Sequence, residues 1–105
     1  MALRSPPQRH WRSYGNAPLP TPQEALWQLF GAFPSWFLRI ECDRCGKATM
    51  INEAPMSEPR RGLALHVLIS RITHDRCGGR VGRAELLSGI EGASSRPVRR
   101  IVLLA

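Results

Sequence analysis

One seven-residue segment of this chain occurs twice, and this repeat constrains the fold more than any other feature of the sequence. Residues 40–46 read Ile-Glu-Cys-Asp-Arg-Cys-Gly, and residues 72–78, at an offset of 32, read Ile-Thr-His-Asp-Arg-Cys-Gly. Five of the seven positions are identical, and at one of the other two Cys42 is exchanged for His74. Thiolates and imidazoles are both zinc ligands, so the exchange preserves the capacity to bind a metal.

The spacing within the repeat is typical of a metal-binding turn, or zinc knuckle. A C-x-x-C turn places two thiolates on one side of a tight loop, at a separation that suits tetrahedral coordination. The glycine after each second ligand permits a positive φ, so that the chain can turn back. Two such knuckles predict one closed Zn²⁺ site, which leaves no open position for a catalytic water. The predicted ligands are Cys42, Cys45, His74 and Cys77, with 28 residues between the two pairs.

Two alternatives remain open for these residues. Cys42 and Cys45 could form a redox pair, although the surrounding sequence lacks the expected βαβ pattern and the second knuckle would then be unexplained. The fourth ligand could instead be His66, which lies in an apolar stretch, or His10, which lies in the N-terminal tail.

The short length of the chain indicates why its fold would need a structural metal. With 105 residues it forms one small domain, and such domains bury proportionally little apolar surface. A structural zinc contributes about 10 kcal/mol or more of binding free energy coupled to folding, so we expect metal removal to unfold the domain.

An odd count of three cysteines argues against a disulfide scaffold. No apolar run approaches a membrane span, and residues 1–13 lack the apolar core of a secretory signal, so we expect a cytoplasmic protein without membrane partners.

The sequence before the first knuckle predicts an arm and a helix. Residues 1–20 are basic and proline-containing, which is typical of a disordered arm. Thr21 and Glu24 form a capping box, with Pro22 at the first helical position. Together with the apolar stripe that follows, this pattern predicts a capped amphipathic helix over residues 21–34.

Residues 35–105 predict a zinc-ribbon-like α+β domain, with two zinc knuckles on β-hairpins bridged by a short helix. Residues 62–71 fit both helical spacing and strand alternation, and we favour the bridging helix. Residues 53–61 read as a connector, and residues 88–96 as a Gly/Ser-rich loop. Apolar alternation predicts strands over residues 35–41, 47–52, 80–87 and 97–104.

On the residues of the two knuckles, the chain resembles the zinc-ribbon and zinc-knuckle group, in particular small uncharacterised bacterial proteins with two C-x-x-C-G knuckles bridged by a helix. The resemblance covers residues 36–104, with His74 where those proteins more often carry cysteine. It implies a metal site and a fold type. It implies no activity, because the group is largely without an assigned one. The matching positions are Cys42, Cys45, Gly46, Cys77 and Gly78.

The charge of the chain suggests a polyanionic partner. Lys and Arg number 15 against 8 acids, a net charge of +7, and all but one of these cations are arginine. Arginine binds phosphate well through its planar, forked donors, so the first hypothesis is DNA or RNA binding through phosphate contacts. A GC-rich coding sequence would produce the same arginine excess without any function. The candidate contacts are Arg44, Arg76, Arg80, Arg83, Arg99 and Arg100.

The second hypothesis is a protein-interaction or assembly module with a purely structural zinc. The N-terminal helix, with Leu26, Trp27, Leu29 and Phe30, or the apolar C-terminal strand would dock the partner. An enzyme is disfavoured, because no nucleophile elbow, P-loop or H-E-x-x-H motif is present and the acids are few and dispersed. No catalytic residue is predicted.

Overall fold

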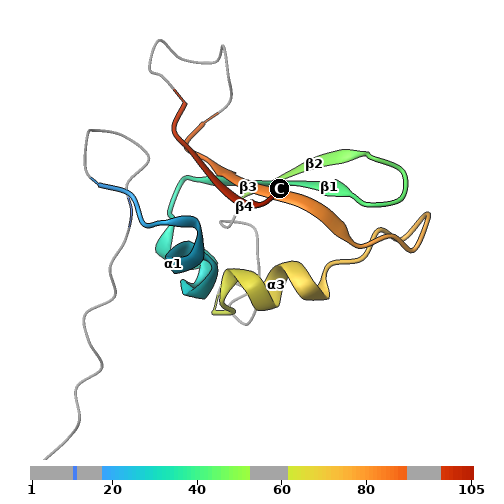
Figure 1. Cartoon of the computed structure of the whole chain (residues 1–105), viewed down its shortest axis with the longest axis horizontal. Helices are drawn as coiled ribbons and strands as arrows, with labels where there is room; N and C mark the ends of the chain where they lie inside the picture. The colour runs from blue at the N-terminus through green and yellow to red at the C-terminus, as the bar shows by residue number, and fades with distance from the viewer. Residues whose placement is uncertain (1–10, 12–17, 53–61, 90–97) are drawn as a thin grey trace, which may run out of the picture.

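The computed structural model describes Trp11 and residues 18–52, 62–89 and 98–105. In this part of the chain, helices lie against one face of a four-stranded antiparallel sheet, which agrees with the predicted α+β class (Figure 1). Neither described α-helix is long and apolar enough to cross a membrane. The elements, in chain order, are α1 (Pro22–Trp27), the 3-10 helix η1 (Phe30–Ala32), β1 (Phe37–Cys42), β2 (Ala48–Asn52), α3 (Leu65–Arg71), β3 (Val81–Leu87) and β4 (Arg100–Leu104).

The sheet has the strand order β2-β1-β3-β4, so the strand that carries the first cysteine lies inside it. In β1, Leu38 and Ile40 are buried beneath the helices, whereas Arg39 and Glu41 point to the other face. This alternation follows from the two-residue period of a strand and matches the sequence prediction. Ile40 pairs in register with Thr49 of β2 and with Ala84 of β3.

The hydrophobic core has an aromatic centre at the end of β1 far from the knuckles. Trp36, Phe30 and Phe33 are fully buried, and Phe33 meets the ring of Trp36 edge-on at 5.9 Å. The ring of Trp11 stacks on Phe33 at 5.1 Å, and its backbone oxygen accepts a hydrogen bond of 3.0 Å from Trp36 Nε1. These contacts hold Trp11 against the aromatic core.

Trp11 therefore departs from the expected disordered arm, because it is only 7% exposed and its N–H donates to the oxygen of Ala32 at 2.8 Å. A large ring next to an aromatic core gains more by burial than the local sequence suggests. The rest of the predicted arm, residues 1–10 and 12–17, lies outside the described residues, as do residues 53–61 and 90–97.

The N-terminal helix is shorter than the predicted span of 21–34. Its start is as expected, since the Thr21 hydroxyl accepts a hydrogen bond of 3.2 Å from Glu24 N–H. It ends at Trp27 because Gln28 turns to an extended conformation, with ψ at 153°, and its oxygen accepts from Leu65 N–H at 2.8 Å. Tertiary hydrogen bonds to the segment before α3 thus replace those of a continued helix.

The bridging helix forms as predicted, but only one knuckle lies on a β-hairpin. The first knuckle closes the β1–β2 hairpin, whereas the second lies between α3 and β3. A single antiparallel bridge, between Thr73 and Arg80, closes this second turn. The strand β3 pairs instead with β1 and β4. Its pairing with β1 brings the second knuckle next to the first.

Candidate metal centre

The two knuckles share one backbone geometry, residue for residue. In the first, Cys42 N–H donates to the oxygen of Lys47 at 3.0 Å, and Gly46 N–H donates to the oxygen of Cys42 at 3.0 Å. In the second, His74 N–H donates to the oxygen of Gly79 at 2.8 Å, and Gly78 N–H to that of His74 at 2.7 Å. Gly46 and Gly78 have φ of 72° and 68°, the left-handed conformation that glycine adopts at little cost.

The sheet brings the four predicted ligands together. Their ligand atoms all lie within 4.8 Å of one another. Cys42 Sγ lies 3.3 Å from Cys77 Sγ, while His74 Nδ1 lies 3.2 Å from Cys45 Sγ and 3.1 Å from Cys77 Sγ. A tetrahedral zinc with Zn–S bonds of about 2.3 Å needs ligand separations of about 3.7 Å, so the group needs only a small expansion to hold an ion. The cysteines are free thiols, not a disulfide.

Of the other two candidate histidines, His66 is not at this cluster. The Nδ1 of His66 is 2.8 Å from the oxygen of Leu26, to which it donates, and its ring lies 4.4 Å from that of Trp27. His66 thus ties α3 to the end of α1. His10 lies outside the described residues. Among the described histidines, His74 alone belongs to the metal-binding group.

Hydrogen bonds join one knuckle directly to the other. Asp43 N–H donates to the oxygen of Arg80, and Arg80 N–H donates to Asp43 Oδ1, both at 2.8 Å. Arg44 Nη1 donates to the oxygen of Cys77 at 3.1 Å. The aspartate between the first two ligands thus accepts a backbone hydrogen bond, as aspartates in turns commonly do, but from the opposite knuckle.

The first knuckle lowers the proton affinity of its own sulfur. The backbone N–H groups of Cys45 and Arg44, which hydrogen-bond to the sulfur, lower the pKa of Cys42 from 9.0 to about 6. The hydrogen bond between the two sulfurs raises the pKa of Cys77, because it stabilises the protonated Cys77 thiol beside Cys42, and repulsion between two thiolates adds a smaller effect in the same direction. Cys42 is therefore the thiolate that is already formed at neutral pH, and a bound cation would favour ionisation of the second.

Two glycines in the glycine-rich turn that the sequence predicts after the second knuckle are required by close approach. A Cβ on Gly79 would overlap Cys42 Sγ and lie 2.9 Å from Asp43 Oδ1. A Cβ on Gly82 would lie 2.9 Å from the Cβ of Asp43. Alignment of the two knuckles carries a signal for Gly79. It takes the position of Lys47, so the second knuckle has a glycine where the first has a long side chain.

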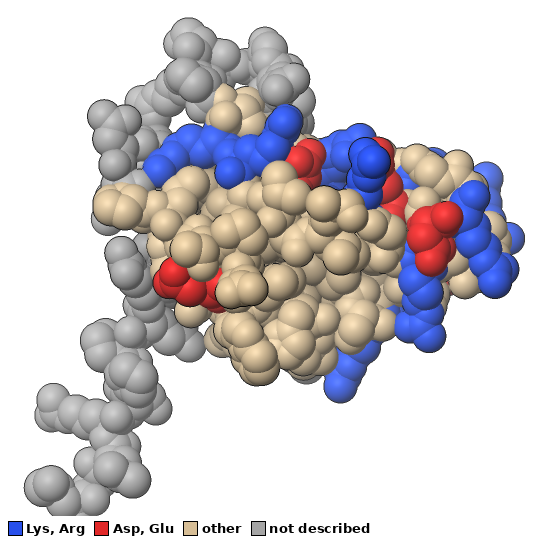
Figure 2. Space-filling view, in the orientation of Figure 1, with Lys and Arg blue, Asp and Glu red and all other residues tan. Residues whose placement is uncertain are grey.

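The six arginines proposed for nucleic acid do not share one face. Arg44, Arg76 and Arg80 lie at the knuckle end, where Figure 2 shows Lys and Arg side chains gathered on the right. Arg99 lies at the opposite end of the sheet, half-buried, with its N–H donating to Ser88 Oγ at 2.7 Å. The remaining two, Arg83 and Arg100, lie on the outer face of the sheet.

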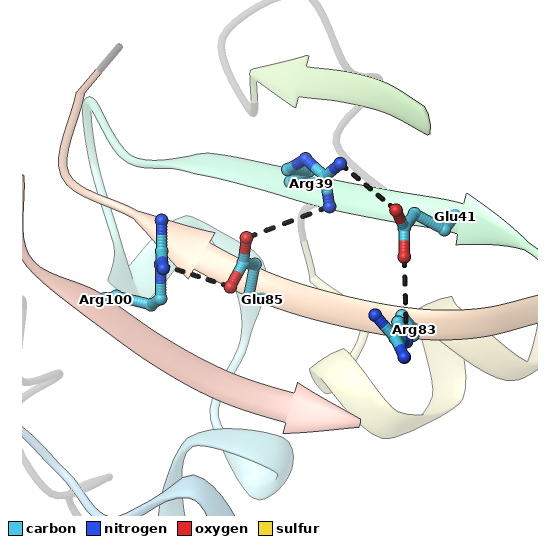
Figure 3. A network of polar contacts seen from close by, with 5 residues as sticks. All are labelled: Arg39, Glu41, Arg83, Glu85 and Arg100. Carbon is cyan, nitrogen blue, oxygen red and sulfur yellow. Dashed lines mark hydrogen bonds and ion pairs between the residues drawn. The ribbon is translucent and has the colours of Figure 1, made fainter. Parts of the chain in front are cut away.

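Glutamates partner the arginines of that outer face (Figure 3). Glu85 contacts Arg100 at 3.2 Å and Arg39 at 3.8 Å. Glu41 contacts Arg39 at 3.1 Å and Arg83 at 3.8 Å. Two glutamates thus offset part of the charge of three arginines, so the outer face offers a polyanion less net positive charge than its arginines alone would.

The close approach at Gly79 predicts that Gly79→Ala weakens metal binding. The new methyl group would push the second knuckle away from Cys42, and such overpacking costs about 1–3 kcal/mol. We expect zinc affinity, measured by competition with a chromophoric chelator, to fall by about 10-fold or more. The matched control is Gly89→Ala, where a Cβ meets nothing within 4 Å. Equal affinities for both variants would contradict the prediction.

The pKa of Cys42 predicts a pH-dependent reactivity in whatever fraction of the reduced, zinc-free protein keeps the fold, as measured by circular dichroism. Alkylation by iodoacetamide, followed site by site with mass spectrometry, should be half-maximal for Cys42 near pH 6. In guanidinium chloride the midpoint should move up towards the ordinary pKa of 9.0. Since the folded pKa is the lower one, the thiolate stabilises the fold above the unfolded pKa, and this stabilisation is lost as pH falls through about 6. A Cys42 profile unchanged by denaturant would refute the assignment.

A scan against models of protein families finds no match for this chain, and neither do comparisons with curated proteins and with solved structures.

Proposed function

We propose that this chain is a zinc-stabilised binding module of the zinc-ribbon type, with no catalytic role for the metal. One observation carries the proposal: three sulfurs and one imidazole nitrogen, from two knuckles with the same hydrogen-bond pattern, lie within 4.8 Å of one another. Soft thiolate ligands with one imidazole in a compact group are typical of structural zinc. All four positions would be filled by protein, so no water would be activated.

The position of the site explains what the zinc would do for the fold. Trp36 of the aromatic core immediately precedes β1, and Cys42 is the last residue of this strand. At about 3.3 Å per residue, the strand separates the two by about 20 Å. The described core residues thin out towards the knuckles, where Ile40 is the nearest buried residue of β1. A metal ion would supply at this end the cohesion that apolar packing supplies at the other.

We expect the purified protein to contain one zinc per chain, measured by plasma mass spectrometry. Cys42→Ser and His74→Ala should each reduce zinc affinity strongly, because each removes a ligand from a closed set. Chelation should lower the free energy of unfolding by about 4 kcal/mol, if free zinc had exceeded its Kd about 1,000-fold. The measurement is urea denaturation with and without chelator.

The matched control for the histidine variant is His66→Ala, which removes an imidazole outside the cluster. Zinc binding should survive in this variant. Zinc content well below one per chain in the wild type would refute the metal site, and full affinity in His74→Ala would reassign the fourth ligand.

For the partner, we propose nucleic acid, bound through phosphates at the knuckle end. Arg44, Lys47, Arg76 and Arg80 are all exposed there. Part of the positive charge of these four side chains is offset by Asp43, Asp75 and the single negative charge of a zinc bound to three thiolates. A small positive excess remains at the knuckle end. Arg44 uses one donor on the oxygen of Cys77, so its guanidinium is held in place with other donors available.

Fluorescence anisotropy with labelled DNA and RNA oligonucleotides at two salt concentrations tests this partner. The double variant Arg44→Gln/Arg76→Gln should weaken binding to both and reduce the slope of log K against log salt by about 1.8 for duplex DNA. The matched control, Arg83→Gln/Arg100→Gln, removes the same charge from the outer face and should change binding less. Absence of salt-dependent binding at micromolar protein would refute the partner.

A protein partner is the second candidate, favoured by exposed apolar side chains. Trp27 is 72% exposed, and Val102 and Leu104 of the edge strand β4 are exposed beside the charged network. Figure 2 shows a broad face between sheet and helices that carries few charged side chains. Of the N-terminal residues expected to dock a partner, Phe30 is fully buried and does not contribute. Light scattering that finds only monomer would count against a self-associating form.

A further inference from the structure

A cavity of about 210 Å³ lies beside the metal centre, between the β1–β2 hairpin and the chain that leaves α3. Its floor is made by Ile40 and Ile51 from the inner face of the sheet. Ile72 forms one wall, and the ligands Cys42 and His74 close the end nearest the metal centre. The remaining lining residues are Lys47, Thr49, Thr73, Gly79 and Arg80.

The cavity exists because the helical layer is shorter than the sheet. The helix α3 spans only seven residues and buries Leu65, Leu68 and Ile69. Beyond its last residue, Arg71, the chain turns into the second knuckle, and neither of the described α-helices packs closely against β2. Ile51 and Ile72, which continue the apolar core, are therefore only half-buried.

The lining has a definite chemistry, with an apolar floor and two cations. Lys47 makes no ion pair with any residue that the structure describes. Arg80 is held in place, since its Nη1 donates to the oxygen of Ser70 at 2.8 Å and its backbone is bonded to Asp43. Apart from Cys42 and His74, which the proposed zinc would occupy, no acidic or aromatic side chain is among the described lining residues, so beside the bound metal an organic cation or a stacked nucleobase would find no partner.

We propose that this cavity binds a small organic monoanion, a carboxylate on a short aliphatic body. The carboxylate would lie between Lys47 and Arg80, and the aliphatic body would cover Ile51 and Ile72. Among the groups that line the cavity, the two cations outweigh the single negative charge of the zinc-loaded site by one, which suits a monoanion better than a phosphate dianion. This charge argument rests on the proposed zinc, whereas the shape and the apolar floor do not. The volume is below the roughly 300–1,000 Å³ of drug-sized clefts, which indicates a small ligand.

The test uses the zinc-loaded full chain with isotope-labelled isoleucine methyl groups. Hexanoate is titrated while methyl NMR shifts of Ile40, Ile51 and Ile72 are followed. We expect saturable shifts at these three methyl groups, and not at Ile101 in the distant part of the core. Acetate, which lacks the body, and 1-hexanol, which lacks the charge, should each bind at least about 10-fold more weakly, because each loses one of the two recognised features.

Two variants separate charge from shape. Lys47→Met keeps the aliphatic stem and removes the charge, and we expect hexanoate affinity to fall severalfold. The matched control is Arg71→Met, which removes an exposed cation that does not line the cavity and should leave affinity unchanged. Thr49→Trp places a large ring over the floor from an exposed position on the edge strand β2 and should abolish the saturable shifts. Zinc content and the amide spectrum report whether each variant is folded.

The outcomes distinguish this proposal from the metal site. If the protein binds one zinc per chain but hexanoate causes no saturable shifts, the cavity proposal is wrong and the zinc proposal stands. If 1-hexanol binds as tightly as hexanoate, the anion specificity is wrong. If no zinc is bound but the shifts at Ile51 and Ile72 still saturate and respond to Lys47→Met, the cavity proposal stands without the metal.

Discussion

The junction between the two knuckles is the constraint on which this structure depends. Cys42 begins one knuckle at the end of an inner strand, and His74 begins the other immediately beyond a helix. Their ligand atoms meet only if β3 runs back beside β1 in the observed register, with Cys42 opposite Val81. The paired hydrogen bonds of Asp43 and Arg80 fix the same register without a metal. Backbone pairing therefore selects the arrangement of the chain in which the four side chains could also hold one metal ion.

The two ends of the sheet are stabilised by different physics. At one end, Trp11, Phe33 and Trp36 bury large rings, and the stability comes from apolar area removed from water. At the other end, glycines and short polar side chains approach too closely for bulky residues, so ligand bonds would have to replace packing. The cavity lies at the boundary between these two regions, where the apolar layer ends and the charged knuckles begin.

Local patterns in the sequence predicted local structure well. The capping box at Thr21, the alternation of β1 and the bridging helix over Leu65–Arg71 all appear in the structure. The end of α1 could not be predicted, because Gln28 leaves the helix to pair with the segment before α3, which is distant in sequence. Trp11 was missed for the same reason, since its partners, Ala32 and Trp36, lie more than twenty residues along the chain.

The sequence by itself determined the candidate ligand set, because a repeated knuckle with one Cys-to-His exchange specifies residue types and spacing that need no knowledge of the fold. Only the tertiary structure decided where each arginine lies and which arginines face glutamates. Arg83 and Arg100 face glutamates on neighbouring strands, while Arg44 and Arg76 remain at the knuckle end. The physical reason is that coordination chemistry is encoded within a short motif, whereas charge compensation depends on which strands become neighbours.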